Sequence, residues 1–177
     1  LTDLARNAAP RNVAADIGRL FGEAIAKKQD TDMTALFDGF STALGDGTAA
    51  ITAAKVFAAA SDLRSAALNI NECAVVLHPK IAYDLKANLT NTFANANAND
   101  LANEALRSGF VGSLAGMRIF ETSNMSNTGT AGDYKGGAFH RDAIALAEMQ
   151  GLKIETQRDA SLRADEIVDT AVYGVGE

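Results

Sequence analysis

The chain has 177 residues, a net charge of −6 at pH 7 and a single cysteine. One cysteine excludes an intramolecular disulfide and a cysteine metal cluster, and the acidic balance is atypical of nucleic-acid-binding proteins. No apolar run reaches the about 18 residues that a membrane span needs, and no signal peptide is recognisable. We therefore expect one domain or two small lobes with no membrane association, and we interpret the start at Leu1 as that of a fragment or processed product.

Residues 10–40 are predicted to form one long amphipathic helix, around which the rest of the chain is organised. The apolar residues recur mostly at steps of three, four and seven, which indicates a buried helical stripe. Pro10 suits the first turn, and the glycines of residues 45–47 suit the stop. Residues 30–32, Asp-Thr-Asp, could cap a second helix and divide the rod. The predicted core of this helix comprises Val13, Ile17, Leu20, Phe21, Ile25 and Leu36.

The length of this helix suggests a role. About 30 residues would make a rod of about 45 Å, well beyond the average helix of about 11–12 residues. A small domain cannot surround such a rod on all sides. We therefore expect the helix to act as a strut, which indicates assembly with other chains.

Three further elements are predicted between residues 52 and 89. Thr52 is placed to cap a helix that continues to Asn69. The run CAVVL at residues 73–77 is apolar and β-branched, which predicts a buried strand with Cys73 as a small hydrophobe. Pro79 suits the start of a helix that continues to about Leu89.

The composition changes at residues 90–100, TNTFANANAND, where asparagine favours turns, and a short helix capped by Asp100 is expected next. Residues 117–122 alternate like a strand and lead into a glycine-rich loop. Three more strands are expected at residues 139–149, 153–158 and 167–175, and the last two are predicted to pair antiparallel. Helices come first and strands dominate the end, so the predicted fold class is α+β.

Groups capable of catalysis are sparse. In the loop GTAGDYKGG, Lys135 precedes the glycine pair and a strand follows, which departs from the nucleotide-binding loop. His78 and His140 have no neighbours at metal-ligand spacing, and no Gly-x-Ser-x-Gly sequence is present. Taken together, the residues predict a non-enzymatic protein without a cofactor or metal. The acidic residues Asp159, Asp165, Glu166 and Asp169 alternate with Arg158 and Arg163, which is typical of an exposed, ion-paired face.

Several blocks of the sequence resemble the major capsid protein of tailed double-stranded DNA bacteriophages, whose shell fold is shared with herpesviruses and encapsulins. NVAADIGRLFGEAIAKKQDTDMTALFDGF resembles the long spine helix of that family. VFAAASDLRSAALN and VVLHPKIAYDLK resemble the helix, strand and second helix of its axial domain. GMRIFETSNM, GGAFHRDAIALAE and LKIETQRDASLRADEIVDTAVYGV resemble its C-terminal strands. The order of the blocks, from about residue 10 onward, carries the resemblance.

The resemblance implies a peripheral domain of residues 1–47 plus 150–177 and an axial domain of residues 48–149. The family's N-terminal arm and extended hairpin have no counterpart before Leu1. It also implies self-assembly into pentamers and hexamers of an icosahedral shell that encloses viral DNA without sequence-specific binding. A decoration or scaffolding protein is a further expected partner. The expected location is the virion capsid, with assembly in the host cytoplasm.

The resemblance further implies that the asparagine-rich tract lies near a five- or sixfold axis, where identical copies meet. Asparagine offers donors and acceptors without like-charge repulsion, which suits a symmetric contact. A surface loop is the plainer alternative. The candidate interface residues are Asn91, Phe93, Asn95, Asn97 and Asn99.

Three other interpretations stay open at this point. An encapsulin-like bacterial compartment would use the same fold around protein cargo instead of DNA. A small nucleotide-binding α/β enzyme would use the loop at residues 129–137. A tail or baseplate component would form rings or tubes instead of closed shells.

Overall fold

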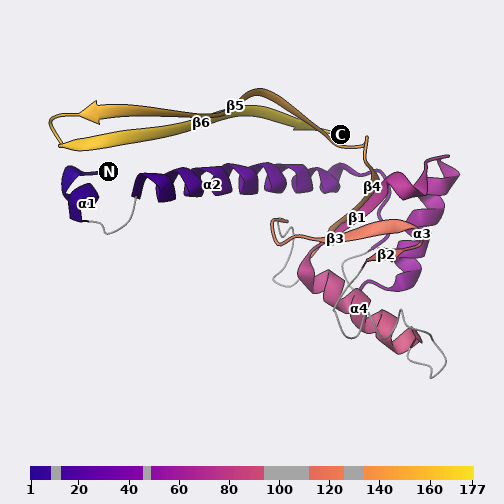
Figure 1. The fold of residues 1–177 in the computed structure, drawn as a ribbon. Helices are drawn as coiled ribbons and strands as arrows, with labels where there is room; N and C mark the ends of the chain where they lie inside the picture. The colour runs from indigo at the N-terminus through magenta and orange to yellow at the C-terminus, as the bar shows by residue number, and fades with distance from the viewer. Residues whose placement is uncertain (9–12, 46–48, 94–111, 126–133) are drawn as a thin grey trace.

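The computed structural model describes residues 1–8, 13–45, 49–93, 112–125 and 134–177. Two parts are visible in Figure 1. The first, called the arm, consists of α1 (Asp3–Ala8), α2 (Val13–Ala35) and the hairpin of β5 (Ala145–Asp159) and β6 (Ala164–Gly176). The second, called the sheet body, consists of four strands with α3 (Ala53–Ser65) and α4 (Pro79–Phe93). The α+β class is therefore confirmed.

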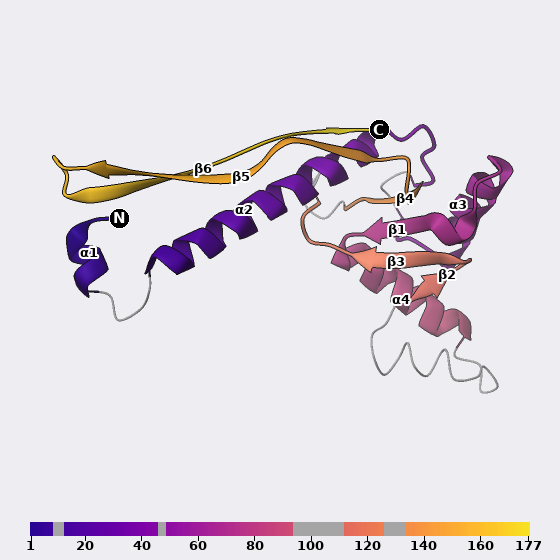
Figure 2. The ribbon, with the colours of Figure 1, turned by 45° about the horizontal axis from the view of Figure 1, so that its top comes forward.

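The sheet body is built around β1 (Cys73–Leu77), which lies between β3 (Met117–Glu121) and β4 (Gly136–His140). It runs parallel to β3 and antiparallel to β4, and the short β2 (Ser113–Leu114) extends the sheet beside β3. Figure 2 shows this layer with α4 along one side. The predicted strand at 73–77 is confirmed. Alternate residues of β1 are buried, starting with Cys73.

The hydrophobic core lies between this sheet and its two helices. Small residues on α3 permit close packing, because alanine brings the helix backbone near the strands. The fully buried Leu85 of α4 and Met117 of β3 fill the centre. The buried cluster contains Val56, Ala59, Ala60, Cys73, Val75, Leu77, Ala82, Leu85, Met117 and Ile119.

The ends of α3 differ from the prediction. Thr52 precedes the helix without a side-chain cap, and Asn88 of α4 instead accepts a 3.1 Å hydrogen bond from the Ala53 N–H. The helix ends at Ser65 rather than Asn69, because Ala67 adopts a left-handed φ of 58° and the Leu68 N–H bonds back into the last turn.

The long helix is continuous from Val13 to Ala35 and passes into the 3-10 turn η1 (Leu36–Gly39). Residues 10–12 of the predicted helix lie outside the described residues. The Asp-Thr-Asp run at 30–32 does not divide it, because those side chains bond elsewhere. Thr31 donates to the Lys27 carbonyl, and Asp32 pairs with Lys28 at 2.5 Å.

The predicted core of this helix is not a core. Leu20 is 54% exposed, and Thr34 is the only fully buried residue of α2. The reason is that only a two-stranded hairpin packs along α2, which is too narrow to bury its whole apolar face (Figure 1). The other predicted core positions are half-buried: Val13, Ile17, Phe21, Ile25 and Leu36.

The terminal hairpin confirms the predicted antiparallel pairing, with Ile154 opposite Asp169 and Arg158 opposite Asp165. Both strands are longer than predicted, and register shifts between Glu148 and Lys153 bend β5. The predicted strand at 139–149 is divided, because a turn at residues 141–144 separates β4 from β5.

Two helix ends are set locally. Thr2 caps α1, because its Oγ1 accepts a 3.3 Å hydrogen bond from the Ala5 N–H. The predicted loop at residues 90–100 is wrong in its first part, since α4 continues through Phe93. Residues 94–111, including the short helix expected after Asp100, lie outside the described residues.

Candidate functional site

The glycine-rich loop does not form a phosphate cradle at its described end. Gly136 and Gly137 lie inside β4, and their lack of side chains is explained by packing. A Cβ on Gly136 would stand 2.5 Å from Leu77 Cδ2, and one on Gly137 would stand 2.9 Å from the Phe37 ring. Lys135 forms an ion pair with Asp38 at 2.5 Å.

The two histidines also have structural partners. His78 stacks on Tyr134 with ring centroids 3.8 Å apart, and its Nδ1 accepts a 3.2 Å hydrogen bond from the Lys80 N–H at the start of α4. Burial lowers the pKa of His78, and the nearby Lys80 ammonium lowers it further. His140 Nε2 lies 3.4 Å from the Glu72 carboxylate, and its Nδ1 accepts a 3.3 Å hydrogen bond from the Asp142 N–H.

Catalytic chemistry has little support elsewhere among the described residues. They hold no group of three or more His, Cys, Asp and Glu side chains that could bind a metal ion. Cys73 is buried, and burial raises the pKa of its thiol, which disfavours a reactive thiolate. None of the described helices is long and apolar enough to cross a membrane.

The arm is held together by polar contacts between α2 and the hairpin. The Tyr173 hydroxyl donates a 2.7 Å hydrogen bond to Asp32 Oδ2, and Gln29 donates to Glu148 at 3.1 Å. The hydrogen bond from Lys28 lowers the pKa of Asp32, and the bond from Tyr173 lowers it further. Asp32 in turn raises the pKa of Tyr173.

The arm joins the sheet body through an aromatic cluster. Phe37 and Phe40, from η1 and the residue after it, pack against Phe139 of β4 with ring centroids 5.3–5.9 Å apart. Thr34 Oγ1 donates to the Asn124 carbonyl, and Asn124 donates to Asp30 at 3.1 Å. The end of α2 is therefore fixed to β4 and to the segment that follows β3, with the helix projecting away (Figure 2).

The hairpin exposes several large apolar side chains, which is unusual for strands that face only water. Met149 of β5 is 89% exposed. A two-stranded hairpin is marginally stable without a covering layer, and only one of its faces meets α2. Val168 and Val172 of β6 alternate with Asp169 and Tyr173, which lie on the face that meets α2, so the two valines lie on the outer face and define the candidate assembly surface of the arm. Further exposed apolar side chains of the hairpin are Leu146, Met149, Leu152 and Ile154.

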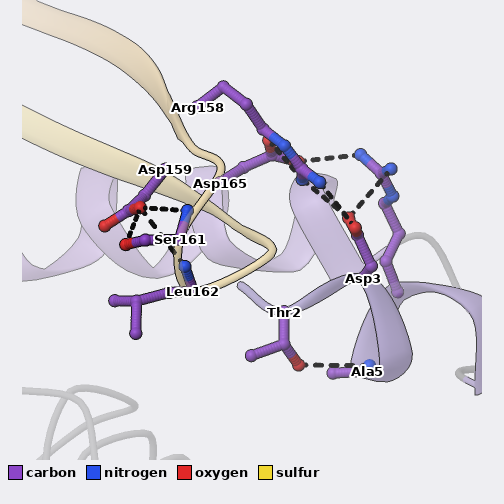
Figure 3. A network of polar contacts seen from close by, with 9 residues as sticks. Thr2, Asp3, Ala5, Arg158, Asp159, Ser161, Leu162 and Asp165 are labelled. Atoms are coloured by element: carbon purple, nitrogen blue, oxygen red, sulfur yellow. Dashed lines mark hydrogen bonds and ion pairs between the residues drawn. The ribbon is translucent and has the colours of Figure 1, made fainter.

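The far end of the arm carries a network that sequence reasoning missed, drawn in Figure 3 and here called the terminal clasp. It consists of Asp3 and Arg6 of α1 with Arg158 and Asp165 of the hairpin. Arg158 donates to both carboxylate oxygens of Asp3 at 2.7 and 2.6 Å and to Asp165 at 3.1 Å. Arg6 donates to Asp165 at 2.8 Å. The predicted exposed, ion-paired face is thus present, with α1 as an unpredicted partner.

These contacts shift the pKa values of the clasp side chains. The hydrogen bond from Arg158 holds the pKa of Asp3 below its ordinary value, and Asp3 raises the pKa of Arg158. The two segments are 155 residues apart in sequence, so no local pattern could have paired them. The alternation of charges at residues 158–166 was the only signal available.

The predicted interface residues of the asparagine-rich tract are only partly described. Asn91 and Phe93 belong to the last turn of α4. Asn95, Asn97 and Asn99 lie outside the described residues, so their place at a symmetry axis stays a prediction.

The chain was compared with known proteins. Residues 1–177 match the model of a family described as phage capsid protein. No curated protein sequence matches the chain. A solved structure of Mycobacterium phage Che8 is similar to it with a TM-score of 0.78 and 27% identity, covering 99% of this chain and 63% of that one.

Two further capsid structures share the fold. The capsid of cyanophage P-SCSP1u has a TM-score of 0.74 at 20% identity, covering 99% of this chain and 66% of that one. The mature capsid of bacteriophage PhiM1 has a TM-score of 0.69 at 17% identity, covering 99% and 64%. The chain thus spans 63–66% of the length of these structures. Because the family model matches every residue, the chain belongs to the phage capsid protein family.

Proposed function

We propose that the chain is the shell-forming region of a phage major capsid protein, whose copies assemble into pentamers and hexamers of a closed icosahedral shell. The observation that carries the proposal is the arm: a 23-residue helix with a hairpin whose outer apolar side chains lack cover among the described residues. Exposed apolar side chains on one face of an element are typical of interaction sites. Each contact needs only modest affinity, because repetition over a closed shell supplies avidity.

The arm and the sheet body correspond, in this proposal, to the two domains of the capsid subunit. The peripheral domain comprises residues 1–47 plus 150–177, and the axial domain comprises residues 48–149. The separation of the arm from the sheet body supports this division (Figure 1). β5 begins at Ala145 and crosses the boundary, so the two domains share one continuous strand.

The proposed content of the shell is viral double-stranded DNA, held without sequence-specific contacts. The net charge of −6 supports this, because an acidic wall repels phosphates and does not adhere to the packaged genome. The proposed location is the virion, with assembly in the host cytoplasm. A decoration or scaffolding protein is a partner that the shell would accommodate on its surfaces.

The asparagine-rich tract is proposed to lie at the inner end of the axial domain, where copies surround a five- or sixfold axis. Its position at the C-terminal end of α4 supports this, since that end of the helix points away from the arm (Figure 1). Replacing Asn95, Asn97 and Asn99 with Asp should impair assembly through repulsion between copies, whereas replacing them with Ser should not. Equal assembly and heat resistance of the Asp variant would contradict a symmetric contact.

Electron microscopy tests the proposed function. The full-length protein that contains this region, expressed alone or with its scaffolding partner, should form closed particles of uniform diameter in negative stain. Rings or tubes would contradict the proposal. Nuclease-protected DNA in particles purified from infected cells is expected, and particles filled with protein and free of DNA would indicate a cargo compartment instead.

The assembly surface is tested by one substitution with a charge-matched control. Val168→Asp adds a charge to the outer face of β6 and should prevent particle formation while the free subunit keeps its melting temperature. Ser61→Asp adds the same charge on α3, away from the arm, and should leave assembly intact. Normal assembly of the Val168→Asp variant would exclude this surface.

A further inference from the structure

We propose that the terminal clasp is a positioning device for assembly: it holds the free end of the hairpin in one orientation on which the uniform shape of the shell depends. The inference rests on the proposed shell function. It concerns Asp3, Arg6, Arg158 and Asp165, none of which contributes to the hydrophobic core. The clasp therefore fixes the orientation of the hairpin end rather than stabilising the fold of the subunit.

Among the residues that the structure describes, this end of the arm has little support other than α1. The hairpin extends beyond the start of α2, and α1 lies beneath its turn instead (Figures 1 and 2). Two strands alone would fray there, because an isolated hairpin is marginally stable in water.

The backbone of the first residues supplies the missing support. Leu1 and Asp165 exchange two hydrogen bonds of 2.8 Å, and the Asp3 N–H donates to the Arg163 carbonyl at 3.0 Å. Thr2 forms an antiparallel bridge with Ala164. Residues 1–3 thus add a short third strand to the edge of β6, which limits fraying of its first residues.

The four charged side chains fix the orientation of that added strand. Each arginine contacts both aspartates, so the four groups form a closed cycle with no net charge. The planar guanidinium of Arg158 grips Asp3 with two nearly parallel bonds, which restricts direction as well as distance. All four side chains are 27–55% exposed. Exposed pairs contribute little to stability, so their main effect is on orientation.

The hairpin turn itself is fixed from the other side. Asp159 Oδ1 accepts hydrogen bonds from the Ser161 N–H, the Ser161 hydroxyl and the Leu162 N–H (Figure 3). Leu162 nevertheless stays 71% exposed, so the turn is ordered without burying its largest apolar side chain. Turns at chain surfaces are usually mobile, and this one is held at both flanks.

A shell of identical copies explains why such order is useful. A shell of pentamers and hexamers depends on a subunit whose arm keeps its own shape, because an error at the far end of an arm is repeated in each copy. A loose end would still allow contacts but would vary their angle. The expected consequence of opening the clasp is a mixture of particle shapes rather than loss of the folded subunit.

The test compares Arg158→Gln with Arg19→Gln in the full-length protein. Both changes remove one arginine, and Arg19 forms a single exposed pair with Glu23 on α2. In the free subunit, Arg158→Gln should leave the melting temperature close to that of the parent. Hydrogen exchange at the Asp3 and Asp165 amides should become about tenfold faster, as expected for local opening. Particles of this variant should vary in diameter or remain open, whereas Arg19→Gln particles should match the parent.

A charge reversal serves as the rescue. The quadruple variant Asp3→Arg, Arg6→Asp, Arg158→Asp and Asp165→Arg restores every pair with its sign reversed, and it should recover slow exchange and uniform particles. Uniform particles from Arg158→Gln despite fast exchange at both amides would overturn the inference, as would failure of the reversal to restore shape when exchange is restored. If the parent forms no closed particles, the proposed shell function fails instead, which separates the two results.

Discussion

Tyr173, near the C-terminal end of β6, donates its hydroxyl hydrogen to Asp32 of α2 at 2.7 Å, and Lys28 holds the same carboxylate at 2.5 Å. This contact ties the hairpin to the helix across 141 residues of sequence. The helix and the hairpin of the arm are joined here by a charge-assisted bond, as they are between Gln29 and Glu148. Such bonds are shorter and stronger than those between neutral groups.

Removing the Tyr173 hydroxyl should loosen the arm. Tyr173→Phe keeps the ring and loses the bond to Asp32, so the free energy of unfolding should fall by about 1–2 kcal/mol. Urea denaturation of the free subunit measures this. Tyr83→Phe is the control, since that residue is 70% exposed on α4 and should unfold like the parent. Equal stability of the two variants would show that the contact does not hold the arm.

The location of the core can be tested by two leucine truncations. Leu85→Ala should cost about 2–5 kcal/mol, because Leu85 is fully buried between α4 and the sheet. Leu20→Ala should change stability by less than about 0.5 kcal/mol, because Leu20 faces solvent in the free subunit. A larger loss at Leu20 than at Leu85, measured by thermal denaturation, would place the core on α2 instead.

The glycine pair of β4 should tolerate no side chain. Gly136→Ala places a Cβ against Leu77 and the Val76 carbonyl, and the resulting overpacking should cost about 1–3 kcal/mol or more. Gly151→Ala in β5 meets no atom within 4 Å and should be neutral or slightly stabilising. The two melting temperatures give the answer directly. Similar values for both variants would mean that β4 shifts to accommodate the methyl group.

The acid response of the sheet body should depend on His78. Because burial lowers the pKa of His78, the folded state favours the neutral ring, which accepts the Lys80 N–H. This contribution is fully present above the unfolded value of about 6.5 and is lost as the pH falls toward the lowered folded value. His78→Asn keeps an acceptor that does not titrate. The melting temperature of the parent should therefore drop more than that of the variant between about pH 8 and about pH 5, and parallel curves would contradict this role.

Sequence reasoning worked where a pattern has a local cause. The continuous apolar run at 73–77 predicts a buried strand, and β1 is a strand whose residues are alternately buried and half-buried. Residues 167–175 are predicted as a strand, and β6 includes them and alternates between half-buried and exposed residues. The blocks that resemble phage major capsid proteins led to the correct family, because their order reflects the whole fold.

The errors arose where the cover of an apolar face decides the outcome. The stripe on α2 identifies an apolar face correctly, but periodicity cannot show whether that face is covered by a complete core or by a narrow hairpin. Leu20 was therefore predicted to be buried and is exposed. Phe57 of α3 is likewise 50% exposed, although its neighbour Val56 belongs to the core. The end of α4 was placed too early, because asparagine lowers helix propensity only slightly when a helix is already formed. The clasp depends on residues at opposite ends of the chain.

The distance between Asp32 and Tyr173 along the sequence also sets an order of events during synthesis. α2 leaves the ribosome 141 residues ahead of the strand residue that it binds, whereas β1, α4 and β3 lie within about 50 residues of one another. Contacts of short separation close first because they restrict less chain. The sheet body should therefore fold while the chain is still growing, and the half-buried Phe21 and Ile25 must wait until the hairpin residues around Tyr173 have been made. A nascent subunit thus carries the apolar face of α2 uncovered while about 141 further residues are synthesised, at a time when neighbouring copies on the same messenger RNA are near.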